Sequence, residues 1–261
     1  MSGFGSGALS VLSGGFVGFS LGLIGGGGSI LATPLLLYVV GIRDAHVAIG
    51  TSALAVSLNA YANLIAHARA GTVRWRNAIL FALIGVIGAF IGSSLGKAFN
   101  GQRLLFLFGI LMVIVGLAML RPKKAGAGKE RAPGSKTNVL VGTIGFSAGA
   151  ASGFFGIGGG FLIVPGLMLS SGMPMINAVG SSLFAVGTFG LATAVNYAWS
   201  GLIDWTVAAE FIFGGVIGGL IGMKLAVYLG ARKNTLNLIF VGIIFIVAAY
   251  VLYRSGRMLM G

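Results

Sequence analysis

Apolar runs long enough to cross a bilayer follow one another along almost the whole chain. Of the 261 residues, 57% are hydrophobic and only 8% are charged, and the mean hydropathy is +1.02. A soluble protein of this length could not cover its surface with so few charged side chains, whereas a bilayer accepts apolar side chains on the outside. Runs of about 17 to 25 apolar residues match the thickness of the hydrocarbon layer. We therefore expect an all-α polytopic membrane protein.

The charge pattern narrows the class of partner. The net charge is +13, but the basic residues cluster where apolar runs end, as the positive-inside rule places them, so we expect no nucleic-acid partner. Residues 1–41 contain no Lys or Arg, which makes a cleaved signal peptide unexpected. The chain has no cysteine, so disulfides and thiol chemistry are excluded.

Five apolar segments precede a polar linker and five follow it. They are expected near residues 4–24, 29–42, 46–69, 75–98 and 102–120, and then near 138–155, 160–172, 175–200, 204–226 and 234–253. The linker, residues 121–136, contains six Lys and Arg and two Pro, which is typical of a cytoplasmic loop. The sequence therefore predicts a first transmembrane repeat over 1–120 and a second over 137–261, with eight to ten transmembrane helices.

The two groups of segments repeat one pattern. The stretch "GGGGSILATP" (25–34) aligns with "GIGGGFLIVP" (156–165), "AIGTSAL" (48–54) with "AVGSSLF" (178–184), and "AGTVRW" (70–75) with "SGLIDW" (200–205). Matched positions keep a nearly constant separation along the half, which indicates an internal duplication. Residues 69–76 contain three Arg, whereas the matched 199–206 contain Asp204 and no basic residue. Such an asymmetry is expected when equivalent loops face opposite sides of a membrane, so we expect inverted repeats; parallel repeats are the alternative if only four segments of each half cross.

The runs of consecutive glycine predict the binding site. Glycine costs roughly 1 kcal/mol relative to alanine inside a helix, so these runs mark short or broken helices. Free N–H groups at such a break attract anions, and glycine lets a ligand reach them. Packing or a tight turn is the alternative, and we accept close packing for Gly88, Gly92 and Gly96 and for Gly214, Gly218 and Gly222. The candidate substrate-binding residues at the breaks are Gly25, Gly26, Gly27, Gly28 and Ser29 in the first half and Gly156, Gly158, Gly159 and Gly160 in the second. We expect the two breaks to face one another near the bilayer midplane, each flanked by a short helix that begins at Ser29 or Gly160.

The third segment of each half adds neutral polar side chains along one helix face. Such side chains in lipid-buried helices turn inward, either to pack against other helices or to line a cavity. The candidate lining residues are Thr51, Ser52, Asn59 and Asn63 in the first half and Ser181, Ser182 and Asn196 in the second.

Few ionisable residues lie away from the segment ends. His67 and Glu210 are the candidates for proton coupling, and the alternative is that both snorkel to the interface. An exported anion is already driven outward by an inside-negative potential, worth about 2.3 kcal/mol per 100 mV, so export does not require a proton carrier.

Enzymatic chemistry finds no support in the sequence. The chain has four acidic residues and two His, without paired carboxylates, metal-ligand spacing or a G-x-S-x-G nucleophile. A Rossmann interpretation of the glycine runs fails because the strand and the downstream acid are missing. We expect no enzyme, no cofactor and no metal.

The repeated G-x-GGG-x4-P pattern, the following GTS and GSS, and the G-x3-W of residues 71–75 and 201–205 resemble the TauE/SafE family of sulfite exporters. The resemblance spans residues 8 to 253, and Gly26 is a mild departure in the first half. It implies a multi-pass permease of a bacterial or archaeal inner membrane that exports small sulfur-containing anions such as sulfite or organosulfonates.

Three hypotheses follow. The first is a secondary transporter whose partners are a small anion and membrane lipid. A passive anion channel with the same glycine-lined constriction is the alternative, and a membrane scaffold in which glycine serves only packing is the third. The sequence is also compatible with a homo-oligomer.

Overall fold

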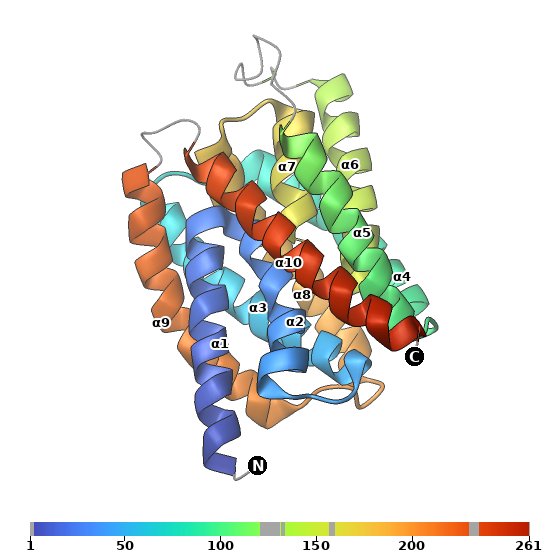
Figure 1. Ribbon diagram of the computed structural model, residues 1–261. Helices are drawn as coiled ribbons and strands as arrows, with labels where there is room; N and C mark the ends of the chain where they lie inside the picture. The colour runs from blue at the N-terminus through green and yellow to red at the C-terminus, as the bar shows by residue number, and fades with distance from the viewer. Residues whose placement is uncertain (1–2, 121–130, 132–133, 157–159, 230–234, 261) are drawn as a thin grey trace.

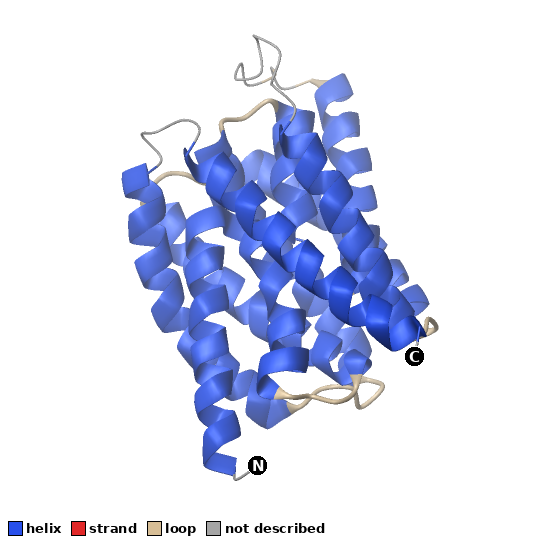
Figure 2. Ribbon diagram, in the orientation of Figure 1, coloured by secondary structure: helices blue, strands red, loops and turns tan. Residues whose placement is uncertain are grey.

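The computed structural model describes residues 3–120, 131, 134–156, 160–229 and 235–260. Throughout this part of the chain the regular elements are helical and no strand occurs (Figure 2). The α-helices are α1 (Gly3–Ile24), α2 (Ala32–Leu35), α3 (Ala45–Arg69), α4 (Trp75–Lys97), α5 (Gly101–Leu120), α6 (Ser135–Phe155), α7 (Gly160–Ser171), α8 (Met175–Ala198), α9 (Trp205–Leu229) and α10 (Thr235–Met260), with a 3-10 helix η1 (Gly25–Leu31) and a π-helix η2 (Leu36–Val40).

The predicted segments coincide closely with these helices. Seven helical stretches of the described residues are long and apolar enough to cross a membrane. One of them, Gly7–Val40, joins α1 to the helical turns that follow it, and α7 has only 12 residues. The protein is thus a multi-pass helical membrane protein, while the expected number of eight to ten spanning helices exceeds the seven found in the described residues.

The outside of the bundle suits a lipid environment. Large apolar side chains such as Leu83, Phe213 and Val139 are more than 60% exposed, at 62%, 65% and 65%. Exposed tryptophans stand at helix ends, with Trp75 at the start of α4 and Trp205 at the start of α9. This is the arrangement expected of side chains at the hydrocarbon surface and at its interfaces with water.

The chain folds back after α1 and again after α6. Gly25 and Gly156 begin these turns with φ of +67° and +64°, a left-handed conformation that glycine adopts without strain. Residues 25–40 return beside α1 toward the end of the bundle where the N-terminus lies, and α7 returns beside α6 toward the opposite end (Figure 1). The two resulting hairpins open toward opposite ends of the molecule.

The break in the first half differs from the expected form. We predicted a short helix beginning at Ser29, but helical turns of the 3-10 type begin at Gly25 itself and include the four glycines. In the second half the short helix begins at Gly160, as predicted. Each returning segment contains a proline, Pro34 or Pro165, which has no N–H for the helical ladder and so keeps it irregular or short.

Glycine also allows two pairs of helices to approach closely. On α1 and α9, a side chain on Gly14 or Gly18 would overlap the backbone of the facing helix, and so would one on Gly214, Gly218 or Gly222. We call this contact between α1 and α9 the glycine seam. The pair α4 and α6 meets in the same way through Gly88, Gly92 and Gly96. The predicted packing role of these glycines is confirmed.

Candidate functional site

The two glycine runs lie against each other inside the bundle. A Cβ on Gly26 would stand 2.7 Å from the Cα of Gly160, and the Gly160 N–H donates to the Ser29 hydroxyl at 3.2 Å. Gly25, Gly26, Gly27, Gly28 and Ser29 are all buried. The predicted meeting of the two breaks is confirmed for these residues, which we call the glycine break; Gly158 and Gly159 lie outside the described residues.

Serine hydroxyls from both halves accept hydrogen bonds from the N–H groups of the break. The Gly26 N–H donates to Ser182 Oγ at 3.0 Å, and Ser182 Oγ donates to the carbonyl of Val179 at 2.7 Å. Ser29 Oγ accepts from Gly160 and donates to the Gly26 carbonyl at 2.8 Å. Both serines are fully buried. Their oxygens therefore occupy the positions that the oxygens of a bound anion would take at these two N–H groups.

A second pair of hydroxyls joins the same returning segment to α3. Thr33 Oγ1 and Ser52 Oγ are 2.7 Å apart, and Ser52 also donates to the Ile49 carbonyl at 2.9 Å. Sequence reasoning selected Ser52 but missed Thr33, although a hydroxyl directly before Pro34 was the available signal. All four hydroxyls are neutral, and those of Ser29 and Ser182 contact the break, so an anion there would be held by hydrogen bonds and backbone dipoles.

Not every glycine of the two runs contacts the other run. A Cβ on Gly28 would overlap the backbone of Ser20 and Leu21, so its contact is with α1. A Cβ on Gly156 would overlap the Ile49 side chain. Gly28 therefore packs within the first half, whereas Gly156, like Gly26 and Gly160, lies where the two halves meet.

Thr51 and Ser181 fix the loops before α9 and α4. The N–H of Asp204 donates to Thr51 Oγ1 at 2.9 Å, and the N–H of Arg74 donates to Ser181 Oγ at 2.8 Å. Each hydroxyl therefore belongs to one half and orders a loop of the other half, beside the glycine break and not within it.

The remaining predicted lining residues are distributed along α3 and α8. Asn59 and Asn63 are buried against Gly215 and Gly219 of α9, and the amide group of Asn59 has no hydrogen-bond partner in the described chain. Asn63 donates to the Asn59 carbonyl at 2.9 Å. They form a polar column along α3 that faces the glycine seam.

Asn196 lies at the other end of α8, in contact with α4. Its amide donates to Ser93 Oγ at 2.7 Å and to Ser94 Oγ at 2.9 Å. The ammonium of Lys97 donates to the Asn196 carbonyl and to its Oδ1, at 3.0 and 2.8 Å. These contacts cap the C-terminal end of α8, because a lysine near a helix C-terminus can hydrogen-bond the last carbonyls of that helix.

The two candidates for proton coupling have different surroundings. His67 is fully buried, with Nε2 3.0 Å from the Gly22 carbonyl and Nδ1 3.0 Å from Thr72 Oγ1. Glu210 is half-buried and lies beside Gly7 near the start of α1. Among the described residues, no three His, Cys, Asp or Glu side chains gather as a metal site would require.

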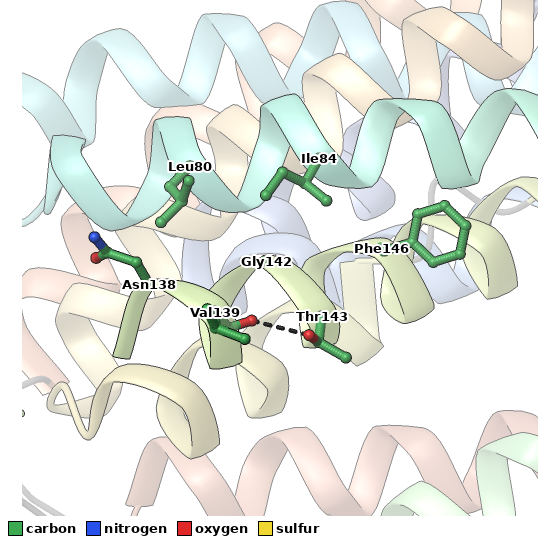
Figure 3. Close-up of a pocket in the computed structure, with 7 residues that line it drawn as sticks. All are labelled: Leu80, Ile84, Asn138, Val139, Gly142, Thr143 and Phe146. Carbon is green, nitrogen blue, oxygen red and sulfur yellow. Dashed lines mark hydrogen bonds between the residues drawn. The ribbon is translucent and has the colours of Figure 1, made fainter. Parts of the chain in front are cut away.

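An open groove on the surface between α4 and α6 has a different character (Figure 3). Its volume is about 510 Å³, and Leu80, Ile84, Asn138, Val139, Gly142, Thr143 and Phe146 line it. The Thr143 hydroxyl donates to the Val139 carbonyl at 2.9 Å, so this polar group is already satisfied. A largely apolar surface of this kind suits a lipid chain and offers little to a small anion.

The comparison with known proteins agrees with this architecture. Residues 10–251 match the family model described as "Sulfite exporter TauE/SafE". A "Probable membrane transporter protein" of Xylella fastidiosa is 58% identical over 254 residues, which cover 95% of each chain. The "Probable membrane transporter protein YunE" of Bacillus subtilis is 29% identical over 78% of this chain and 84% of its own. The "Probable membrane transporter protein MJ0441" of Methanocaldococcus jannaschii is 28% identical over 69% and 70%. No solved structure matches this chain.

Proposed function

This chain belongs to the sulfite exporter TauE/SafE family, and on that premise we propose that it is a secondary transporter that exports a small sulfur-containing anion. The substrate is sulfite or an organosulfonate, and it binds at the glycine break. The membrane is the inner membrane of a bacterium or an archaeon, since the relatives come from both. The basic linker at 121–136 faces the cytoplasm.

One observation carries the site assignment. The N–H groups of Gly26 and Gly160 come from different halves and meet in one buried place, where each donates to a serine hydroxyl of the opposite half. An anion that enters the glycine break replaces these hydroxyls as the acceptor of the two N–H groups. Ser29 and Ser182 are then free to turn their own protons toward it, because a hydroxyl both donates and accepts. The site gains donors at the moment of binding without needing a charged residue.

We further propose that residues 1–120 and 137–261 are inverted repeats. Support comes from the exchange of contacts between halves: α1 packs on α9 while α4 packs on α6. The paired bonds of Thr51 to Asp204 and of Ser181 to Arg74 join matched positions of the two halves. In an inverted pair the two hairpins rock against each other around a central site, which gives access to one side at a time.

Transport assays in proteoliposomes test this function. We expect saturable sulfite flux that an unlabelled anion on the opposite side accelerates, since an alternating-access carrier returns faster when loaded. Flux that is never accelerated in this way, and that only follows the anion's own gradient, would establish the channel alternative. No saturable flux or binding of any anion would overturn transport itself.

A thermal-shift series identifies the substrate class. Binding to the native state raises the apparent stability by RT ln(1 + [L]/Kd). We expect sulfite, taurine or sulfoacetate to raise the melting temperature more than acetate does. Gly242→Ala is the matched control variant and should show the same shifts as the parent chain, because a Cβ at Gly242 meets nothing within 4 Å. A larger shift with acetate than with every sulfur compound would contradict the proposed substrate class.

A further inference from the structure

His67 occupies an environment that satisfies both of its protonation states. Its Nε2 faces a carbonyl, that of Gly22, so Nε2 carries a proton in either state. Its Nδ1 faces Thr72 Oγ1, a hydroxyl that can donate or accept. In the neutral ring the Thr72 hydroxyl donates to Nδ1. In the charged ring Nδ1–H donates to Thr72 Oγ1, and the hydroxyl turns to the His67 carbonyl, 3.0 Å away.

One rotation of a hydroxyl therefore accompanies the gain of one proton. Burial of an ionisable group is costly when its charged form lacks partners, and here the charged form has an acceptor for each N–H. Thr72 is half-exposed and Arg69 is exposed, so a proton from water at this end of the bundle can reach Nδ1. A new N–H bond forms at Nδ1 while the hydroxyl bond of Thr72 is kept.

The charged groups of the surrounding elements are few. α1 contains no ionisable side chain, α8 contains only Tyr197 at its far end, and the loop before α4 contributes Arg74. Arg69 follows His67 on α3, and α9 contains Glu210 near its start and Lys224 and Tyr228 near its end. None of the described carboxylates is hydrogen-bonded to the imidazole. A proton on His67 thus adds a positive charge that the protein does not already neutralise.

Two short connections run from His67 to the glycine break. Through Nε2 it bonds to Gly22, which stands three residues, or about 4.5 Å of helical rise, before Gly25. Through Thr72 it reaches α8, because the Thr72 carbonyl accepts from Asn177 at 3.0 Å and the nearby Arg74 N–H donates to Ser181. Ser182, the next residue, accepts the Gly26 N–H.

We propose that His67 and Thr72 form a proton-binding site coupled to the anion at the glycine break. This inference rests on the proposed function. An imidazolium near the break favours an anion there, and by linkage the anion favours the imidazolium to the same extent. The protein then carries a proton with its anion, although export alone does not require one.

The ring of His67 can be observed without a transport assay. The chain has two His, so His46→Gln leaves a single histidine whose two ring ¹⁵N signals can be observed in bilayer samples. Over a titration from about pH 8 down to about pH 5, we expect a neutral ring protonated at Nε2 that becomes imidazolium toward the acidic end. Saturating sulfite at constant pH should raise the imidazolium fraction. A ring that keeps one form throughout this range, with and without sulfite, overturns the proposal.

A pair of variants separates the hydroxyl from the packing of the side chain. Thr72→Val removes the acceptor of the imidazolium and keeps the shape, whereas Thr72→Ser restores the hydroxyl. We expect Thr72→Val to weaken sulfite binding at acidic pH by about tenfold or more, as for one lost hydrogen bond to a charged group, and Thr72→Ser to behave as the parent chain. Equal pH profiles for the two variants contradict the proposal.

The outcomes distinguish this inference from the proposed function. Saturable sulfite flux in the parent protein without any response of His67 overturns the proton site and leaves transport standing. Absence of flux and binding for every anion overturns the proposed function, while the NMR titration still reports whether His67 takes up a proton.

Discussion

Glycine performs different tasks in the glycine seam and in the glycine break. In the seam, Gly14, Gly18 and Gly218 lie within regular helices, and the missing side chain lets two backbones touch. In the break, Gly26 and Gly160 release N–H groups that bond to serines of the opposite half. Glycine thus permits close helix packing in the seam, whereas in the break it supplies the N–H groups to which we propose that the anion binds.

The largest expected effect is the loss of stability caused by a substitution in the glycine seam. Gly218→Val places a branched side chain against the backbone of Gly15, where neither helix can yield without separating. Overpacking costs at least about 1–3 kcal/mol, and we expect little folded protein in the membrane. Thermal unfolding in detergent measures the loss. Gly242→Val in α10 is the control, and equal stability of the two variants would remove the distinction between seam and open glycine.

The next effect concerns the break. Gly160→Ala would overlap the backbone of Gly26, so the halves must separate where the anion binds. We expect sulfite flux to fall at least about tenfold, equivalent to about 1.4 kcal/mol, in protein that still inserts. Gly242→Ala gives the reference for insertion and flux. Wild-type flux in Gly160→Ala would show that this glycine, too, serves packing alone.

The next test concerns the serines. Ser182→Ala removes an acceptor of Gly26 and a donor to the anion, and we expect sulfite affinity to fall roughly tenfold to 150-fold, the range for a hydrogen bond to a charged group. Ser181→Ala is the neighbouring control, because its hydroxyl orders the loop at Arg74. Isothermal titration compares them, and equal losses of affinity would place the anion elsewhere.

The smallest expected effect is that of removing a charge in the glycine seam. Glu210 lies on α9 beside Gly7 of α1, so Glu210→Gln changes a charge in the seam and leaves the break intact. We expect sulfite flux to be unchanged and stability to move by no more than about 0.5 kcal/mol. Loss of proton-coupled flux in this variant, with anion binding preserved, would transfer the proton site from His67 to Glu210.

The sequence predicted the helices well because the length of an apolar run and the spacing of glycine follow directly from bilayer thickness and helix geometry. It also predicted that the two glycine runs meet, since matched positions of a duplicated chain occupy related places. It missed Thr33, where the position directly before Pro34 was the one available signal, and Thr72, because a single threonine outside a repeated pattern indicates no partner. The hydrogen-bond partners of Asn196 could not be predicted either, since they depend on how α8 packs against α4.

The exchange of hydroxyls between halves has a consequence for biogenesis. When the ribosome has made only residues 1–120, the acceptor of the Gly26 N–H and the helix that covers α1 do not yet exist, since both come from residues 182 and beyond. Chains emerge at about 5–20 residues per second, so the first half waits in the membrane for seconds with uncovered backbone. Until α9 is made, the backbone of α1 at the glycine seam has no partner helix, and two halves made as separate polypeptides would have to associate within the bilayer before either is complete.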